Sequence, residues 1–220
     1  LTLNRATDTT RQPGSTFKIL AAYSAALDAG GLTLASVQDD APYTYAGANG
    51  KSVNNYDRRY RGFTTLREAI TDSINIVTVK TLAQAGVSLG WQYVQEYGFT
   101  TVDSRDMNEA LALGGITQGV SNLELTAAYA AIANQGTYIK PKFYTKILDH
   151  DGNVLIDNTT PESHTVIKDT TAWLLTSAME DVMTSGTGTS AYFGSSMAQA
   201  GKSGTTTSSR DALFAGYTPY

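Results

Sequence analysis

The chain has 220 residues, 41% of them hydrophobic and 16% charged, and these proportions predict one globular domain with a sizeable core, not a disordered or fibrous segment. Its 16 basic and 20 acidic side chains leave a formal net charge of −4 without a run of like charges, which argues against nucleic acid or an acidic membrane surface as a partner. Cysteine is absent, so thiol nucleophiles, disulfides and thiolate metal sites are excluded, and no apolar stretch approaches the ~20 residues that span a bilayer.

The first predicted element is a helix over residues 15–29. Apolar residues recur through it at helical spacing, and Gly30-Gly31 is a suitable C-terminal stop. A Pro-Gly turn delivers Ser15 to the start of this helix, and Lys18 follows three residues later. Because residues three apart share a helix face, the Ser15 hydroxyl and the Lys18 amine are expected to meet, as a nucleophile beside a base.

Residues 39–62 are rich in Gly, Asn, Tyr and Asp and are predicted to form an irregular surface excursion, whose aromatic side chains either pack against the body or rim a substrate site. A capping box at Thr65-Leu-Arg-Glu68 starts a short helix, and a second helical run, "TDSINIVTVKTLAQAG", ends at Gly86. Ser73 is therefore expected at or near the junction of two helices.

The rest of the chain predicts three helices, a hairpin and a final pair of strands. A helix is expected over 88–97, and an Ala-rich core helix follows a second capping box, Ser121-Asn-Leu-Glu124. "FYTKILDHDGNVLI" predicts a hairpin around Asp151-Gly152, and "DTTAWLLTSAMEDVM" predicts an amphipathic helix that "GTG" at 186–188 ends. "AGKSGTTTSS" and "DALFAGYTPY" predict two strands joined by a polar turn. No internal repeat or linker divides the chain.

Three short motifs carry side chains suited to acyl transfer. They are, in chain order, Ser15-x-x-Lys18, Ser73-Ile74-Asn75 and Lys202-Ser203-Gly204. Each is weak alone, because the first also fits a helix cap with a solvated lysine and the third a strand end with a surface lysine. Ser52-Val-Asn54 repeats the spacing of the second motif but lies in the polar excursion, whereas an apolar helical run can hold Ser73 rigidly. All three motifs in this order are far more specific than any one.

With these motifs the chain resembles the transpeptidase domain of class A, bifunctional penicillin-binding proteins, which share S-x-x-K, S-D-N and K-T-G signatures with serine β-lactamases. The resemblance extends through "NRATDTTRQPGSTFK", "NNYDRRYRGFTTLREAITDSINIVTVK", "LALGGITQGVSNLELTAAYAAIANQGTYIKP" and "GKSGTTTSSRDALFAGYTP", and covers nearly the whole chain. Two positions depart from the family pattern. Ile74 stands at the variable centre of the second motif, and Ser203 replaces a threonine whose hydroxyl it can supply.

The resemblance implies an α+β fold in which a central antiparallel β-sheet packs between helices, as in β-lactamases and transpeptidases. In the family this sheet also takes strands from before the Ser-x-x-Lys helix, and one more strand and a helix after the last strand of this chain. Residues 1–220 are therefore expected to be a fragment of a transpeptidase domain, whose partners include the remaining segments of that domain. A glycosyltransferase domain and a membrane anchor are expected upstream, which implies the extracytoplasmic face of the bacterial cell membrane.

The resemblance also implies a D,D-transpeptidase that cross-links peptidoglycan stem peptides ending in D-Ala-D-Ala, is acylated and inhibited by β-lactams, and needs no cofactor or metal. Ser15 is the implied nucleophile, which forms an acyl-enzyme and releases D-alanine. Lys18 can take its proton only as a neutral amine, which a lysine with an ordinary pKa of ~10.4 rarely is. Burial and the neighbouring cation Lys202 are expected to lower that pKa.

The other motif residues have implied roles in proton transfer and binding. Ser73 relays protons between the leaving group and the lysines, and Asn75 hydrogen-bonds the substrate amide. The backbone N–H groups of Ser15 and Thr205 form an oxyanion hole, where the helix dipole at Ser15 favours the developing negative charge. The residues implied to bind the substrate's terminal carboxylate are Ser203, Gly204 and Thr205.

Other catalytic chemistries fit the sequence less well. A Ser-His-Asp triad would need His150, in the hairpin turn "DHDG", or His164, in the polar "PESHT", and both are expected to be solvated loop residues. Two histidines without helical His-x-x-x-His spacing, in a chain without cysteine, do not make a zinc site.

Two alternatives with the same fold stay open, a β-lactamase that hydrolyses its acyl-enzyme quickly and a β-lactam sensor that acylates once. The Glu-x-x-Leu-Asn motif of class A β-lactamases is absent, since neither Glu109-Ala-Leu-Ala nor Glu124-Leu-Thr-Ala fits it. Slow deacylation is therefore predicted. A globular domain with chance motifs is the remaining alternative, and the presence of three ordered motifs counts against it.

Overall fold

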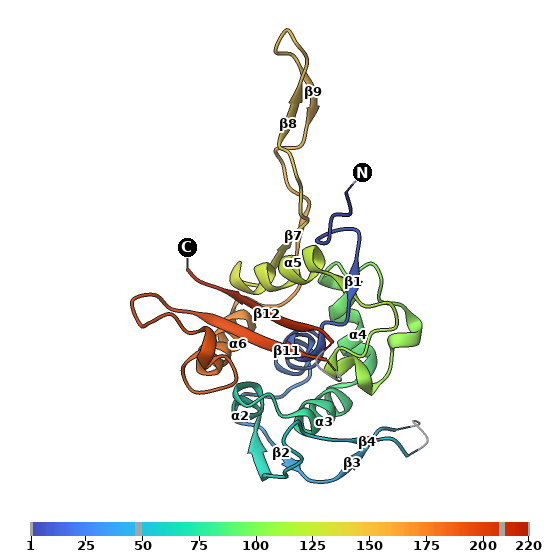
Figure 1. Ribbon diagram of the computed structural model, residues 1–220, viewed down its shortest axis with the longest axis vertical. Coiled ribbons are helices and arrows are strands. Elements are labelled where there is room, and N and C mark those ends of the chain that lie inside the picture. Colours follow the sequence, from blue (N-terminus) through green and yellow to red (C-terminus); the bar gives the residue numbers. More distant parts are fainter. Residues whose placement is uncertain (1, 47–49, 207–209, 220) are drawn as a thin grey trace.

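A helical segment that is buried from Phe17 to Ala26 forms the centre of the molecule. The computed structural model describes residues 2–46, 50–206 and 210–219, and Figure 1 shows this segment in blue behind two long strands. The helix predicted over 15–29 is confirmed, although its hydrogen-bond pattern changes from a 3-10 turn to π-helical turns and then to an α-helix. These parts are η1 (Gly14–Thr16), η2 (Ile19–Tyr23) and α1 (Ser24–Asp28).

Two long antiparallel strands, β11 (Ala200–Thr205) and β12 (Ala212–Tyr217), cross in front of the central segment (Figure 1). Alternate residues from Leu213 to Tyr217 are partly buried while those between them are exposed, as in a strand with one covered face. Both predicted strands are confirmed. The polar turn predicted between them includes residues 207–209, which lie outside the described residues.

Helices surround the central segment and pack against the two strands. Both predicted capping boxes are present, Thr65 with Glu68 and Ser121 with Glu124. The Ala-rich helix contacts β12 and contributes buried residues to the core, and the amphipathic helix contacts β11. The predicted fold class, α+β with helices packed on antiparallel strands, is confirmed. The helices are α2 (Leu66–Thr71), α3 (Asn75–Ala85), α4 (Val87–Glu96), α5 (Asn122–Ala133) and α6 (Asp169–Thr184).

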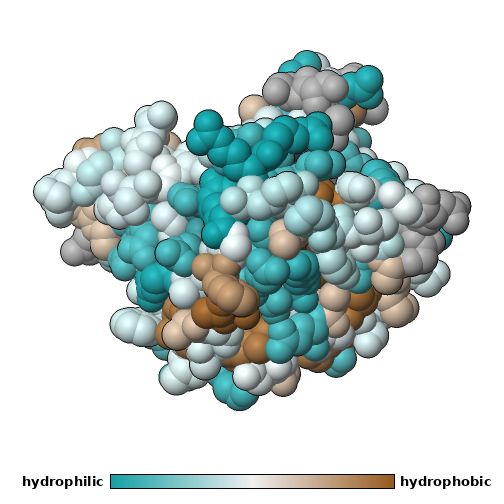
Figure 2. Space-filling view, turned by 90° about the horizontal axis from the view of Figure 1, so that it is seen from below, coloured by the Kyte–Doolittle hydropathy of each residue, from teal (hydrophilic) through white to brown (hydrophobic). Residues whose placement is uncertain are grey.

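The prediction that 39–62 is irregular was wrong in part, because short paired strands lie in it. β2 (Val37–Asp40) pairs with β5 (Gly62–Thr65), and β3 (Tyr43–Thr44) pairs with β4 (Ser52–Val53), both antiparallel. These strands are two to four residues long. Their formation depends on pairing with a strand elsewhere in the chain, and no local alternation of apolar and polar residues predicts them. Figure 2 looks at this end of the molecule and shows a mostly hydrophilic surface with apolar residues in small patches.

A hairpin of β8 (Lys146–Leu148) and β9 (Val154–Asp157) projects away from the body (Figure 1), which confirms the hairpin predicted around Asp151-Gly152. At its base β7 (Thr137–Ile139) pairs with β10 (Ser163–Thr165). The remaining short elements are β1 (Thr10–Arg11), which pairs with β6 (Val120–Ser121), and the 3-10 turns η3 (Ser104–Asp106), η4 (Glu109–Leu113) and η5 (Thr189–Ala191).

A groove of about 720 Å³ lies between α5 and β12, and within the described part of the chain β12 pairs with β11 alone. The additional sheet strands that the family resemblance implies stay a prediction. In the ranges that the structure describes, no helix has both the length and the hydrophobicity needed to cross a membrane.

Gly90 tests how tightly α4 packs on the central segment. A Cβ at this position would lie 2.5 Å from the Ala21 carbonyl oxygen and would also meet Leu82. We expect Gly90→Ala to lower the free energy of unfolding by about 1–3 kcal/mol, and the melting temperature by roughly 2–4 °C for each kcal/mol.

Thermal denaturation followed by circular dichroism measures this effect. Gly152→Asn is the matched control, because a Cβ there meets nothing within 4 Å and Asn tolerates its positive φ of 85°. An unchanged melting temperature for Gly90→Ala would contradict the packing argument.

Candidate active site

The turn that carries Ser15 is pressed against the end of strand β11. Gly14 adopts a left-handed φ of 55°, and a Cβ on it would lie 3.1 Å from the Thr205 carbonyl oxygen. From the other side, a Cβ on Gly204 would lie 2.6 Å from the Pro13 carbonyl oxygen. Glycine at both positions therefore allows the backbone of the turn and the backbone of the strand to touch.

Lys18 is completely buried in the central helical segment, and its amine lies among three oxygen atoms from the junction of α2 and α3. Nζ is 2.7 Å from the Ser73 carbonyl oxygen, 2.7 Å from Asn75 Oδ1 and 3.2 Å from Ser73 Oγ. The sequence predicted that Lys18 faces Ser15, one helical turn before it. The hydrogen bonds of its amine instead go to the second motif.

The Ser73 hydroxyl lies between two buried lysines. Lys202 Nζ, from β11, donates to Ser73 Oγ at 2.9 Å and to the Ser203 carbonyl oxygen at 3.1 Å. Ser73 itself has a left-handed φ of 56°, which costs a non-glycine residue on the order of 1–2 kcal/mol. This strained junction presents both the hydroxyl and the carbonyl group of one residue to Lys18.

The surroundings of both lysines lower their pKa below the ordinary value of a lysine. Burial, with a smaller contribution from the nearby charge of Lys202, holds the pKa of Lys18 well below its usual value. Burial also lowers the pKa of Lys202, to about 7. The expectation that burial and Lys202 depress the pKa of Lys18 agrees with this environment.

A cleft of about 690 Å³ opens beside Ser15. Asn75 of α3 and Thr205 of β11 line it, and so does Gly114, whose Cβ would lie 2.5 Å from the Gly14 carbonyl oxygen. The segment 51–54 forms part of its wall. The charged side chains on its lining are Lys51, Arg210 and Asp211.

The structure brings the three sequence motifs together. Of the predicted site residues, Ser15, Asn75 and Thr205 line the cleft, and Lys18, Ser73 and Lys202 are joined by hydrogen bonds behind them, whereas Ser203 and Gly204 are not on the lining. Thr205 lines the cleft, but the Ser203 hydroxyl is 2.8 Å from Thr187 Oγ1, and Ser203 is not on the lining. Asn75 lines the cleft while its side chain bonds Lys18 and donates from Nδ2 to the Asn54 carbonyl oxygen at 2.7 Å.

Sequence reasoning missed several residues that line or support the cleft. Ser52 and Asn54, which had been set aside in favour of Ser73 and Asn75, lie on its lining. Buried Glu109 accepts from Tyr43 Oη and from the backbone N–H of Ala46, both at 2.9 Å, and so ties the β3–β4 hairpin to η4. In the sequence, the only indication that Ser52 and Asn54 belong to the site was that they repeat the Ser-x-Asn spacing of Ser73 and Asn75.

Neither histidine is on the lining of the cleft that contains Ser15. His150 is exposed near the tip of the hairpin, as predicted. His164 was predicted in a loop but belongs to β10, where it is partly exposed and Nε2 lies 2.8 Å from the Glu96 carbonyl oxygen. Across the described ranges, no three His, Asp or Glu side chains are grouped so that they could hold a metal ion.

Comparison with known proteins gives one consistent family. The family model described as "Penicillin binding protein transpeptidase domain" matches residues 2–220. Penicillin-binding protein 1F of Bacillus subtilis is 39% identical over 215 residues, which cover 95% of this chain and 29% of that protein. The chain thus spans less than a third of that relative's length.

Solved structures agree with this match. Penicillin-binding protein 1A from Haemophilus influenzae superposes with a TM-score of 0.86 at 28% identity, over 98% of this chain and 37% of that one. The imipenem acyl-enzyme complex of penicillin-binding protein A from M. tuberculosis has a TM-score of 0.85 at 20% identity, over 99% of this chain and 53% of that one, and shows the same fold.

The buried lysine pair is expected to reduce stability at neutral pH. Folding lowers the pKa of Lys202 from ~10.4 in the unfolded chain to about 7. The resulting loss of folding free energy is complete below pH 7 and disappears above the pKa of the unfolded chain. We therefore expect Lys202→Met to raise the free energy of unfolding at pH 7 by about 1–4 kcal/mol, because methionine carries no charge to be buried on folding.

Urea denaturation of the parent and of Lys202→Met at pH 7 and at pH 10 measures the difference. The gain should shrink as the pH rises, because the unfolded chain then also loses its lysine proton. Exposed Lys51→Met is the control and should give no such pH-dependent gain. A loss of stability at pH 7 would contradict the expectation.

Proposed function

This chain belongs to the family of penicillin-binding protein transpeptidase domains, and we propose that it works as a serine acyltransferase on peptidoglycan stem peptides ending in D-Ala-D-Ala, with Ser15 as the nucleophile. The family's transpeptidase activity is an acyl transfer. The observation that carries the proposal is the Ser73 hydroxyl held by two buried lysine amines next to the cleft of Ser15.

In the first step Ser15 Oγ attacks the carbonyl carbon of the peptide bond, and its proton goes to Lys18. A neutral amine has two N–H groups and one lone pair. The two shortest contacts of Lys18, to the Ser73 carbonyl oxygen and to Asn75 Oδ1, use the N–H groups. The lone pair is then left to accept a proton, either directly from Ser15 or through Ser73 Oγ.

In the second step the tetrahedral intermediate collapses, the peptide C–N bond breaks, and the leaving D-alanine takes a proton through Ser73. Lys202 donates to Ser73 Oγ, which favours the direction of that transfer. An acceptor amine of a second stem peptide then attacks the ester, the ester C–O bond breaks, and Ser15 recovers its proton. This order of events makes a cross-link and releases one D-alanine.

The negative charge that develops on the carbonyl oxygen needs hydrogen-bond donors. The backbone N–H groups of Ser15 and Thr205 are suited to this role, because the turn and the strand that carry them touch through Gly14 and Gly204. We assign the terminal carboxylate of the substrate to Thr205, which lines the cleft, with Gly204 beside it. Ser203 takes part there only if its hydroxyl leaves Thr187.

We further propose that the chain acts in the bacterial cell envelope, on the extracytoplasmic face of the membrane, where its peptidoglycan substrate lies. β-Lactams are expected to acylate Ser15 because they present a strained amide to the same cleft. Support for this comes from the acyl-enzyme complexes named for other penicillin-binding proteins of the same fold.

Intact-mass spectrometry of the full chain mixed with benzylpenicillin tests the nucleophile. We expect one covalent adduct per chain, which persists over hours, and its complete loss in Ser15→Ala. Ser88→Ala, an exposed serine on α4, should be acylated like the parent.

The other outcomes are equally informative. An adduct that forms and then disappears within minutes indicates a β-lactamase, and a folded chain that never acylates contradicts the proposal. Release of D-alanine from a D-Ala-D-Ala peptide in the presence of an acceptor amine separates a transpeptidase from a sensor, which would acylate without turnover.

A further inference from the structure

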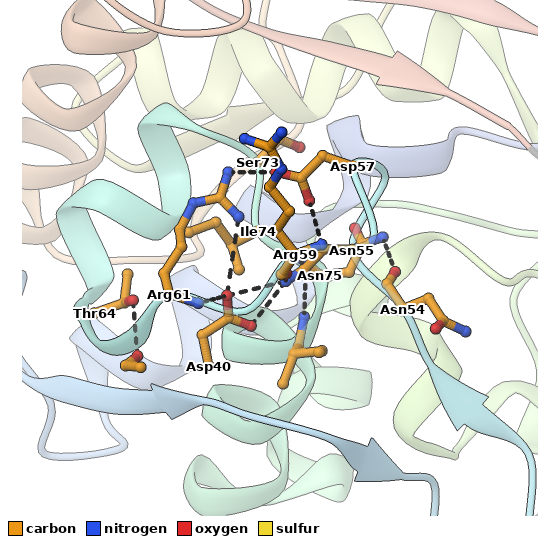
Figure 3. A network of polar contacts seen from close by, with 12 residues as sticks. Asp40, Asn54, Asn55, Asp57, Arg59, Arg61, Thr64, Ser73, Ile74 and Asn75 are labelled. Atoms are coloured by element: carbon orange, nitrogen blue, oxygen red, sulfur yellow. Dashed lines mark hydrogen bonds and ion pairs between the residues drawn. The ribbon is translucent and has the colours of Figure 1, made fainter.

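The N-terminus of α3, which carries the second motif, is capped by a side chain from a distant loop. Its own N-cap residue is Ile74, which has no side-chain oxygen. Asn55 Oδ1 instead accepts from the backbone N–H of Asn75 at 3.0 Å and from that of Ile76 at 3.2 Å (Figure 3). Two of the N–H groups that the first helical turn leaves without a partner are thereby satisfied.

The orientation of the Asn55 amide is set by a buried carboxylate. Asn55 Nδ2 donates to both carboxylate oxygens of Asp40, at 2.8 and 3.0 Å, and to the Arg59 carbonyl oxygen at 2.8 Å (Figure 3). Asp40 is fully buried and Asn55 is 2% exposed. A flipped amide would aim its NH₂ group at the helix N–H groups and its oxygen at a carboxylate, so only one orientation is compatible with both neighbours.

Asp40 is itself held in place. Its Oδ2 accepts from the backbone N–H of Arg61 at 2.9 Å, and the Arg61 guanidinium lies 3.9 Å away. The Arg61 guanidinium also pairs with Asp57 at 3.0 Å, on the partly exposed side of the loop. Asp40 therefore joins β2 to the loop that presents Asn55.

The capped segment supplies the acceptors of the catalytic lysine. Both the Ser73 carbonyl oxygen and Asn75 Oδ1 accept from Lys18, and Asn75 Nδ2 donates to the Asn54 carbonyl oxygen. The loop at 54–55 thus holds Asn75 by its backbone N–H and by its side chain. A shift of this loop would move two of the atoms that surround Lys18.

We propose that Asn55, oriented by Asp40, is a positioning residue for the acyl transfer, which sets where Ser73 and Asn75 stand around Lys18. This inference rests on the proposed function, because it assigns a role within that reaction. Asn55 is not itself on the cleft lining, so it acts through Asn75 and the start of α3. The alternative is that Asn55 and Asp40 only fasten the 39–62 loop to the body.

The test compares the full chain with Asn55→Ala. We expect the second-order rate constant for acylation by benzylpenicillin to fall about tenfold or more, since small displacements at an active site have effects of that size. We also expect the acidic limb of its pH profile to move to higher pH. The charged group that faces Lys18 is Lys202. Loosening the segment admits water to Lys18, which weakens the effect of burial and raises the pKa of Lys18 toward its ordinary value.

A titration of the lysine ¹³Cε NMR signals of Lys18 and Lys202 provides a readout that does not need acylation. If the parent chain is not acylated, the proposed function fails, but a shifted Lys18 titration in Asn55→Ala still supports the positioning role. An unchanged titration overturns it. Asp40→Asn removes one of the carboxylate oxygens that accept from Asn55 but keeps the Asn55 cap. It should move the acylation rate and the Lys18 titration in the same directions as Asn55→Ala, by smaller amounts, and it replaces that variant if Asn55→Ala does not fold.

Two controls separate positioning from general stability. Asp57→Asn breaks the ion pair with Arg61 on the same loop, without touching the cap, and should leave the pH profile in place. Ser121→Ala removes the N-cap of α5 and should lower stability by a similar amount without moving the profile. If Asn55→Ala folds, acylates within twofold of the parent and keeps its pH profile, Asn55 only fastens the loop and the proposal is wrong.

Discussion

Two lysine amines meet at one serine hydroxyl inside the protein, and the rest of the site follows from the need to keep them there. Lys18 and Lys202 are both completely buried, and each lies within hydrogen-bond distance of Ser73 Oγ. Placing a second cation beside a buried first one favours the neutral form. The same arrangement that destabilises the fold therefore lowers the pKa of Lys18, which favours the base role proposed for it.

Such a pair is tolerated only if every polar group around it has a partner. In the part of the chain that the structure describes, no buried side-chain nitrogen or oxygen lacks a hydrogen bond. The lysine amines donate hydrogen bonds to the carbonyl oxygens of Ser73 and Ser203 and to the amide oxygen of Asn75. Ser73 supplies two of the oxygen atoms around Lys18, its carbonyl oxygen and its hydroxyl oxygen, and it does so with a left-handed backbone.

Close backbone contact fixes the turn that carries Ser15, the proposed nucleophile, against strand β11. Gly14 and Gly204 let the Ser15 turn touch β11, and Gly114 brings η4 against the same turn. Because β11 also carries Lys202, this one contact sets the position of Ser15 relative to both the strand and the second lysine. The Asp40–Asn55 pair holds the start of α3, which carries the second motif, in a similar way.

The sequence by itself determined the features that depend on neighbouring residues. The capping boxes at Thr65 and Ser121 and the helix end at Gly86 follow from groups within four positions of each other, and the structure has all three. The three motifs identified the side chains that converge. Tertiary structure alone decided their partners, because Lys18 bonds residues 55 and 57 positions away and Lys202 bonds a residue 129 positions away. It also turned the Ser203 hydroxyl toward Thr187 and made Asn55 the cap of α3, since such contacts leave no local pattern from which they could be predicted.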